Sequence, residues 1–478
     1  MSEKSTALVW FRRDLRLQDN PALTYAIENY EQILPVFIHA PHEEQPWQPG
    51  AASNWWLHHS LLALQKQLQS SGASLTILQA DSLVGLRQLI DQYDVSGVFW
   101  NRLYEPALIE RDTQIKQSLR QLGLDCQSFA ANLLNEPHTI ANGSGKPYRV
   151  FSAYWRSCEK TLDQLEPPLP APRAIKSVAV NDQGVSVDEL GLLPAINWYQ
   201  GFEKRWQPGE AGAWRQFERF LQAGLADYQE ARDLPVESGT SLLSAHLHFG
   251  EISPRQIIWS TNIKAPSSTQ LEPHRYRFFA ELGWREFGHY LLYHFPNSQE
   301  CSLDQRFDAG GWVESSSIEA EIERWQRGQT GIPLVDAGMR ELWHTGWMHN
   351  RVRMIVASLL SKNLGAHWLV GARWFWDTLV DADLASNSMG WQWTAGCGVD
   401  AAPYFRVFSP QRQTERFDKA CEYIKQWVPE LANVDNKAII NIQHLHERAD
   451  YPEPMLDLSA SRKAALQRWD IIKNAQAV

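Results

Sequence analysis

Hydrophobic and polar positions alternate with different periods in the two halves of the chain. In the first 130 residues, short continuous apolar runs predict buried strands, at residues 6–11, 33–38, 75–78 and 95–100. Amphipathic stretches with helical spacing separate them, at residues 55–68 and 111–122. Strands that alternate with helices predict a parallel, Rossmann-like α/β sheet, with ligands expected at the carboxyl ends of its strands.

From residue 213 onward the apolar spacing is helical almost throughout. Helices are predicted at residues 214–225, 275–293, 333–342 and 351–364. A proline-rich segment at residues 167–172 and the polar stretch after it interrupt regular structure. We therefore expect an α/β domain at residues 1–135, an interdomain connection at 136–212 and a larger all-helical domain at 213–478.

Composition excludes several classes of protein. The 478 residues include 45 Lys and Arg against 55 Asp and Glu, a net charge of -10, which excludes a globally basic nucleic-acid binder but allows a local basic face. The five cysteines are scattered and form no CxxC pair, so zinc sites, iron–sulfur clusters and disulfide frameworks are not expected. Without a signal sequence or a long apolar run, we expect a cytoplasmic protein that avoids membranes. No Walker A or GxGxxG sequence follows the first strand, which disfavours a classical nucleotide site there.

Tryptophan is the compositional outlier. The chain has 22 tryptophans, and ten of them lie between Trp284 and Trp393. Within this region Glu281, Trp284 and Arg285 share one face of a predicted helix. A carboxylate, a flat ring and a guanidinium together suit a flat, polar ligand such as a nucleobase. The alternative is an ion pair beside a core tryptophan.

Two arginines and two aspartates form a second candidate group. Arg351 and Arg353 begin a very apolar predicted helix, where buried guanidinium groups require anionic partners. Asp381 and Asp383 are the candidate partners, either in a functional site or in a structural salt bridge. No third ligand of suitable spacing accompanies the aspartates, so no metal site is expected.

Small hydroxyl residues precede another predicted helix, at residues 239–244. Free N–H groups and hydroxyls at such a position can hold phosphate. An ordinary helix cap is the alternative explanation.

Taken together, these segments resemble the DNA photolyase and cryptochrome family over nearly the whole chain. The matching motifs are residues 10–20, 239–244, 246–250, 284–287, 329–331, 335–340, 346–354 and 381–393. The resemblance implies an α/β domain followed by a helical domain that binds FAD. In this family a second, antenna chromophore often accompanies FAD, so the resemblance implies methenyltetrahydrofolate or 8-hydroxy-deazaflavin as that chromophore, with no antenna as the alternative.

The resemblance further implies which residues hold FAD. Those matched to the phosphate and ribityl region are Tyr228, Thr240, Ser241, Leu242, Leu243 and Ser244. Arg353 and Asp381 would pair over the isoalloxazine, Asp383 would approach its polar edge, and Asn387 would face N5, where an amide suits a flavin kept reduced. The same match places further residues at the cofactor, namely Phe278, Glu281, Arg285 and Asn350.

Within the family, the chain is most similar to bacterial cyclobutane pyrimidine dimer photolyases of class I or III. Trp284 and Trp393 match the two tryptophans that clamp a flipped dimer, with Glu281, Asn350 and Met354 completing the catalytic group. (6-4) photolyases carry histidine in place of Asn350, and plant cryptochromes typically carry tyrosine and aspartate in place of Trp393 and Asn387. Residues 101–106, 245–250 and 375–379 resemble segments of plant cryptochromes, which bacterial class III photolyases share. A blue-light photoreceptor without repair and a (6-4) photolyase are the alternatives.

By the family mechanism, photoexcited reduced FAD passes an electron to a dimer in DNA, the cyclobutane ring opens, and the electron returns. The resemblance therefore implies a carbon–carbon lyase. The electron path for flavin photoreduction is matched by Trp391 and Trp368, and by Trp312 if an insertion is allowed; Trp374 and Trp376 offer a detour. Candidate phosphate contacts are Arg232, Arg351, Arg406 and Arg412, beside Trp284, Asn350 and Trp393 at the lesion. The resemblance implies UV-damaged DNA as the partner, and we expect a monomer.

Overall fold

A computed structural model describes residues 6–180, 184–309, 311–401, 405–442 and 444–474. Five parallel strands form one sheet in the order β3-β2-β1-β4-β5. They are β1 (Thr6–Phe11), β2 (Gln32–His39), β3 (Thr76–Gln79), β4 (Val95–Asn101) and β5 (Asp125–Phe129). The four predicted strands are therefore present, and β5 was missed because its sequence, with Asp125, Gln127 and Ser128, lacks a continuous apolar run.

Helices cover both faces of the sheet. These are α1 (Pro21–Asn29), α2 (Ala51–Ser70), α3 (Ser82–Tyr93) and α4 (Pro106–Gln121). Successive residues of β1 point to opposite faces of the sheet: Val9 packs with α1 and α2, whereas Leu8 and Trp10 pack with α3 and α4. This doubly covered parallel sheet confirms the predicted α/β fold.

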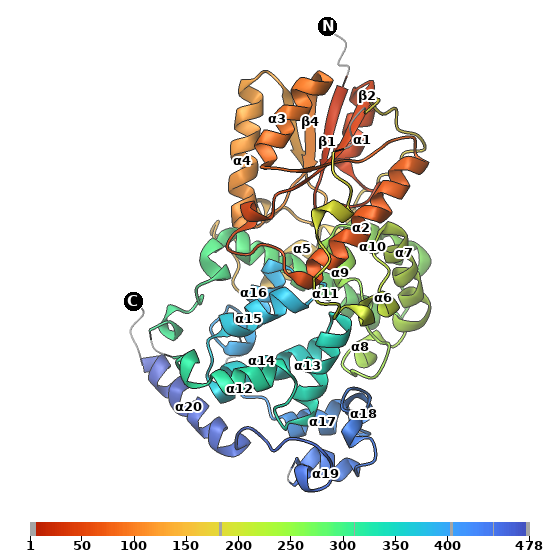
Figure 1. Ribbon diagram of the computed structural model, residues 1–478. Coiled ribbons are helices and arrows are strands. Elements are labelled where there is room, and N and C mark those ends of the chain that lie inside the picture. The colour runs from red at the N-terminus through yellow and green to blue at the C-terminus, as the bar shows by residue number, and fades with distance from the viewer. Residues whose placement is uncertain (1–5, 181–183, 310, 402–404, 443, 475–478) are drawn as a thin grey trace.

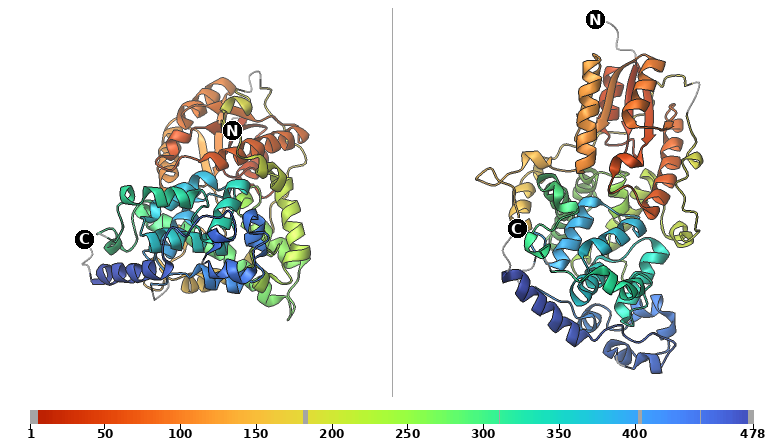
Figure 2. Two further views of the ribbon diagram at one scale, coloured as in Figure 1. Left: turned by 60° about the horizontal axis from the view of Figure 1, so that its bottom comes forward. Right: turned by 60° about the vertical axis from the view of Figure 1, so that its left-hand side comes forward.

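The rest of the chain is helical and lies below the sheet in Figure 1, with α20 at the far end of the molecule. The helices that follow the sheet are α5 (Phe151–Glu159), α6 (Gln200–Arg205), α7 (Glu210–Arg219), α8 (Tyr228–Ala231), α9 (Ser244–His248), α10 (Pro254–Lys264), α11 (Glu272–His294) and α12 (Glu319–Gln326). The remaining helices are α13 (Pro333–Thr345), α14 (Asn350–Ser358), α15 (Trp368–Thr378), α16 (Leu384–Ala395), α17 (Pro410–Phe417), α18 (Glu422–Trp427), α19 (Asn436–Asn441) and α20 (Leu458–Asn474). Figure 2 shows the same separation of sheet and helices from two other directions.

The segment between sheet and helical part is more ordered than its polar sequence predicts. It contains α5, whose Tyr154 and Trp155 are buried against α11. It also returns to the sheet through isolated bridges from Ser177 to Ile33 and from Gly184 to Ile77. The connection expected at residues 136–212 thus includes a regular helix, α5, which lies before the irregular stretch expected from residue 167 onward. A helix of only nine residues gives a short periodic signal in the sequence.

Buried polar contacts fix the sheet part to the helices. Glu251, after α9, accepts hydrogen bonds from Trp56 Nε1 at 3.0 Å and Ser60 Oγ at 2.6 Å, both on α2. Arg16 donates to the carbonyl oxygen of Gly250 at 2.7 Å. These bonds fix Gly250 and Glu251, and with them the adjoining residues 240–248, against the sheet part. Among the described residues, no helix is both long and apolar enough to cross a lipid bilayer.

Candidate functional site

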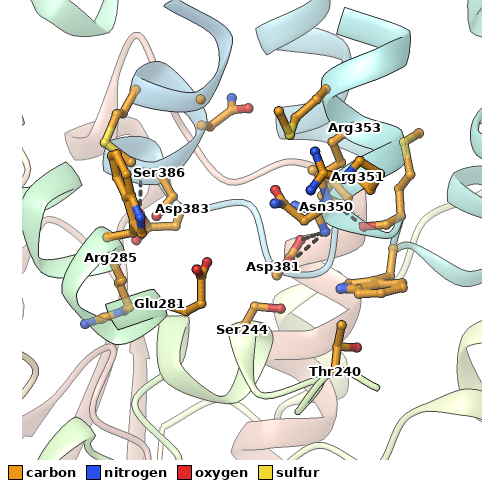
Figure 3. A pocket seen from close by; sticks show the side chains of 18 of the residues that line it. Thr240, Ser244, Glu281, Arg285, Asn350, Arg351, Arg353, Asp381, Asp383 and Ser386 are labelled. Carbon is orange, nitrogen blue, oxygen red and sulfur yellow. Dashed lines mark hydrogen bonds and ion pairs between the residues drawn. The ribbon is translucent and has the colours of Figure 1, made fainter. Parts of the chain in front are cut away.

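A cavity of 570 Å³ lies within the helical part, between α8, α11, α14, α16 and the loop at residues 240–244. Its size falls within the roughly 300–1,000 Å³ typical of small-molecule sites. Figure 3 shows Glu281, Arg285 and Asp383 on one side of it, and Asn350 and Arg353 on the other. The cavity therefore brings together side chains from segments that are more than a hundred residues apart in the chain.

The first ion pair on the cavity joins α14 to the loop before α16. Arg353 Nη2 donates to both carboxylate oxygens of Asp381, at 2.9 and 3.1 Å, and its Nε donates to the carbonyl oxygen of Met348 at 2.7 Å. The Asp381 side chain is only 3% exposed. A buried carboxylate held by one guanidinium presents a fixed polar edge to a flat ligand.

Arg351 has a different partner from the one predicted. Its Nη2 donates to Asp233 at 2.6 Å, and its guanidinium lies over the ring of Phe417. The expectation that Asp381 or Asp383 pairs with Arg351 was wrong, because residues two positions apart on a helix point to different sides. Arg353 points toward Asp381, whereas Arg351 points toward Asp233 and Phe417.

Asp383 is held by two histidines that sequence reasoning missed. Its Oδ2 lies 3.5 Å from His248 Nδ1 and 3.3 Å from His289 Nε2, and all three side chains are buried. Burial favours a raised pKa for Asp383, but the two histidines outweigh it and hold that pKa well below its usual range. Burial lowers the pKa of His248. Asp383 is therefore a carboxylate at neutral pH.

Most residues expected at the cofactor line the cavity. From Tyr228 and the 240–244 loop these are Tyr228, Thr240, Ser241, Leu242, Leu243 and Ser244. The loop is tied back by Gln216, whose Nε2 donates to the carbonyl oxygen of Ser241 at 3.0 Å. On the opposite wall, Asn387 is oriented by a 2.9 Å bond from its Nδ2 to the carbonyl oxygen of Ala372.

Phe278 is an exception. It is buried behind the cavity wall, packed against Phe220 and Tyr228, and is not one of the lining residues. Phe278 therefore supports the cavity residue Tyr228, and its own contact with the cofactor stays a prediction. Arg285 does line the cavity, and its guanidinium is held by the carbonyl oxygens of Asn132 and Leu247.

Two half-buried tryptophans, Trp284 and Trp393, line the same cavity together with Met354 and Asn350. Trp284 stacks on Phe151, with ring centroids 3.7 Å apart and planes 11° apart. Trp393 donates from Nε1 to the carbonyl oxygen of Asp400 at 2.9 Å. Trp284 is thus supported on one face and Trp393 at the edge of its ring, and neither Phe151 nor Asp400 was found from the sequence.

Glu281 forms an ion pair with Arg232, the residue directly after α8, and Arg277 Nη2 lies 3.5 Å from the same carboxylate oxygen. The Arg232 side chain is only 10% exposed. Arg232 was expected as a phosphate contact, but it lines the cavity and neutralises Glu281. Arg406 and Arg412 are exposed and lie outside the cavity lining.

The tryptophans expected to carry electrons run away from the cavity into the core. Trp391 lines the cavity, while Trp368 is fully buried in the same core cluster and donates to Ser302 Oγ at 3.3 Å. Trp312 is half-buried, and the ring of His367 lies between it and Trp368, 4.8 and 5.8 Å from their centroids. His367 is an additional aromatic group that no sequence motif indicated.

Comparisons with known proteins agree with each other. Residues 7–173 match the family model described as DNA photolyase, and residues 278–470 match the FAD binding domain of DNA photolyase. The chain is 41% identical over 477 residues to a deoxyribodipyrimidine photo-lyase of Agrobacterium fabrum, covering 98% of both chains. It is 34% identical to Cryptochrome-2 of Arabidopsis thaliana, covering 100% of this chain and 80% of that one. A bacterial class III photolyase from Agrobacterium tumefaciens superposes with a TM-score of 0.92 at 40% identity, covering 99% of each chain.

Proposed function

This chain belongs to the DNA photolyase family, and on that premise we propose that it repairs cyclobutane pyrimidine dimers in DNA with light, using FAD. One observation supports this most strongly: Trp284 and Trp393 line the same cavity as the residues matched to the flavin. An electron donor and a flipped dimer would then occupy one continuous space. The enzyme is accordingly a deoxyribodipyrimidine photo-lyase.

The cavity residues fit FAD in chemistry as well as in size. Hydroxyls and backbone groups of Thr240 and Ser244 suit its phosphates, and the Arg353–Asp381 pair suits the polar ring system. Asn387 offers an amide that can donate or accept a hydrogen bond. When bound, reduced and photoexcited, FAD supplies the electron that opens the cyclobutane ring and takes it back.

The lesion itself would lie between Trp284 and Trp393. Flipping a dimer out of the duplex costs a few kcal/mol, and stacking on aromatic side chains contributes about 1–3 kcal/mol per base. Two aromatic walls are therefore sufficient to offset that cost. Met354 packs beneath the lesion, and Asn350 offers a polar contact to a pyrimidine edge.

Glu281 acts on the pyrimidine through its pair with Arg232. A bare carboxylate repels a carbonyl oxygen that gains negative charge, whereas a carboxylate bridged by a guanidinium does so much less. We propose that Arg232 and Glu281 meet the dimer as one unit. Contacts to the DNA backbone then fall to exposed cations outside the cavity, such as Arg406 and Arg412.

A second chromophore needs a separate site. A cavity of only 70 Å³ lies at the carboxyl ends of the strands, where Arg13 pairs with Glu44 and Glu105 and where Arg12 pairs with Asp112. At 70 Å³ this cavity is well below the roughly 300–1,000 Å³ typical of small-molecule sites. We propose that methenyltetrahydrofolate or 8-hydroxy-deazaflavin binds outside this cleft. The absorption spectrum of pigment released from purified protein distinguishes the two.

The decisive experiment incubates FAD-loaded protein with an oligonucleotide that contains a single thymine dimer, under blue light and in the dark. Dimer loss under light alone is the expected result. Light-driven flavin chemistry without dimer loss would instead indicate a cryptochrome-type photoreceptor. Trp393→Ala should weaken dimer binding by about 5- to 150-fold, whereas Trp343→Ala is a matched control, because Trp343 is 42% exposed and lies outside the cavity lining.

A further inference from the structure

We propose that Asp400 is a positioning residue that ties the two aromatic walls of the lesion pocket together and so sets the gap between Trp284 and Trp393. This inference rests on the proposed function, since the gap matters only for a stacked ligand. Asp400 lies in the loop after α16 and touches both walls through different atoms: its main chain holds one, and its side chain holds the other through Phe151.

The main-chain contact fixes Trp393. Trp393 lies in the last turn of α16, and its indole N–H donates to the carbonyl oxygen of Asp400 at 2.9 Å. Trp has only two side-chain torsions, and a hydrogen bond at the far edge of the ring restrains both. The plane of this wall therefore follows the position of the Asp400 backbone.

The side-chain contact fixes Trp284 indirectly. Asp400 Oδ2 accepts a hydrogen bond from the backbone N–H of Phe151, the first residue of α5, at 3.3 Å. Phe151 stacks on Trp284 and lies nearly parallel to Trp155, with 8° between their planes. Trp155 in turn lies against Gly283, where a Cβ would approach it to 2.3 Å. Phe151, which is not a lining residue of the cavity, thus covers one face of Trp284.

The backbone of Asp400 is strained in a way that glycine would relieve. Its φ is +52°, in the left-handed region, which costs a residue other than glycine about 1–2 kcal/mol. A glycine would remove this cost but also the carboxylate that holds Phe151. Strain of this kind persists where surrounding contacts determine the conformation, and here those contacts are the two walls.

Three variants separate positioning from stability. Asp400→Gly and Asp400→Ala both lose the bond to Phe151, but only glycine relieves the strain; Asp400→Asn keeps a side-chain oxygen that accepts from Phe151. We expect the Gly and Ala variants to bind dimer-containing DNA about 2- to 10-fold more weakly, as the loss of one net hydrogen bond implies. Binding to undamaged DNA, FAD content and the Asn variant should stay close to wild type.

Hydrogen exchange provides a readout that needs no DNA. The Phe151 amide should exchange faster in the Gly and Ala variants than in wild type or the Asn variant. Unchanged exchange, or equal losses of affinity for damaged and undamaged DNA, would overturn the inference. A wild-type protein that does not prefer dimers would refute the proposed function and the lesion role of Asp400 with it, while the exchange data alone would still test the link between the walls.

Discussion

The two walls of the lesion pocket are backed differently, which predicts unequal losses when each is truncated. Phe151 stacks directly behind Trp284 at a centroid distance of 3.7 Å. Trp284→Ala therefore uncovers a second aromatic face, one ring layer further from the cavity. Trp393 is held only at its ring edge, by the carbonyl oxygen of Asp400, and no ring in the described part of the chain stacks on it. Its removal leaves no aromatic substitute.

The magnitudes follow from the strength of stacking. A base stacked on an aromatic side chain gains about 1–3 kcal/mol, so Trp393→Ala should weaken binding of a dimer by about 5- to 150-fold. Trp284→Ala should lie at the lower end, about 5-fold, because Phe151 takes over part of the contact. The double variant Phe151→Ala with Trp284→Ala removes both layers and should approach the loss seen for Trp393→Ala.

The measurement is the dissociation constant for a fluorescent oligonucleotide with one thymine dimer, in the dark and at fixed salt. An oligonucleotide without the dimer corrects for binding to the backbone, and flavin absorbance confirms that each variant is loaded. The reasoning fails if the double variant binds as tightly as Trp284→Ala alone. It also fails if Trp284→Ala loses more affinity than Trp393→Ala.

Four further outcomes are expected. Trp391→Phe should reduce the rate of flavin photoreduction to a small fraction, while repair by chemically reduced protein continues; a normal photoreduction rate would refute the path. His289 and His248 depress the pKa of Asp383, so the stability that this carboxylate contributes is fully present above its unfolded pKa and is lost as pH falls below about 4. The thermal unfolding temperatures of wild type and Asp383→Asn should therefore converge only in acid. Glu281→Ala should lower the repair yield, and an unchanged yield would contradict its role. Arg412→Ala should reduce the slope of log affinity against log salt by about 1, and an unchanged slope would exclude a phosphate contact.

The sequence predicted what depends on local pattern. Continuous apolar runs located β1, β2, β3 and β4. The central strands β1, β2 and β4 are buried almost throughout, and the edge strand β3 still contains the adjacent apolar pair Ile77 and Leu78. The edge strand β5 has Asp125, Gln127 and Ser128 in five residues and was missed. Helix α1 was also missed, although Asn20 caps it and Pro21 begins it, because nine residues are too few for a strong periodic signal.

The candidate site shows the same division. Motif resemblance identified residues that line the cavity, but not which side chains pair with them. Asp233 and Arg351 are 118 positions apart, and His289 and Asp383 are nearly as distant, so no spacing rule connects them. Helical periodicity indicates which face is buried, whereas the choice of ion-pair partner depends on how distant helices pack.

The position of Phe151 limits how this enzyme can be divided. Along the chain, helix α5 comes after the last strand of the sheet and before the helices that carry the cavity. It nevertheless supplies the ring that stacks on Trp284 and the amide that donates to Asp400. A fragment that begins at residue 213 would retain the residues matched to FAD but lose the support of one wall. Minimal light-driven enzymes made from this chain should therefore keep residues 151–159, and those cut after them should bind pigment well and damaged DNA poorly.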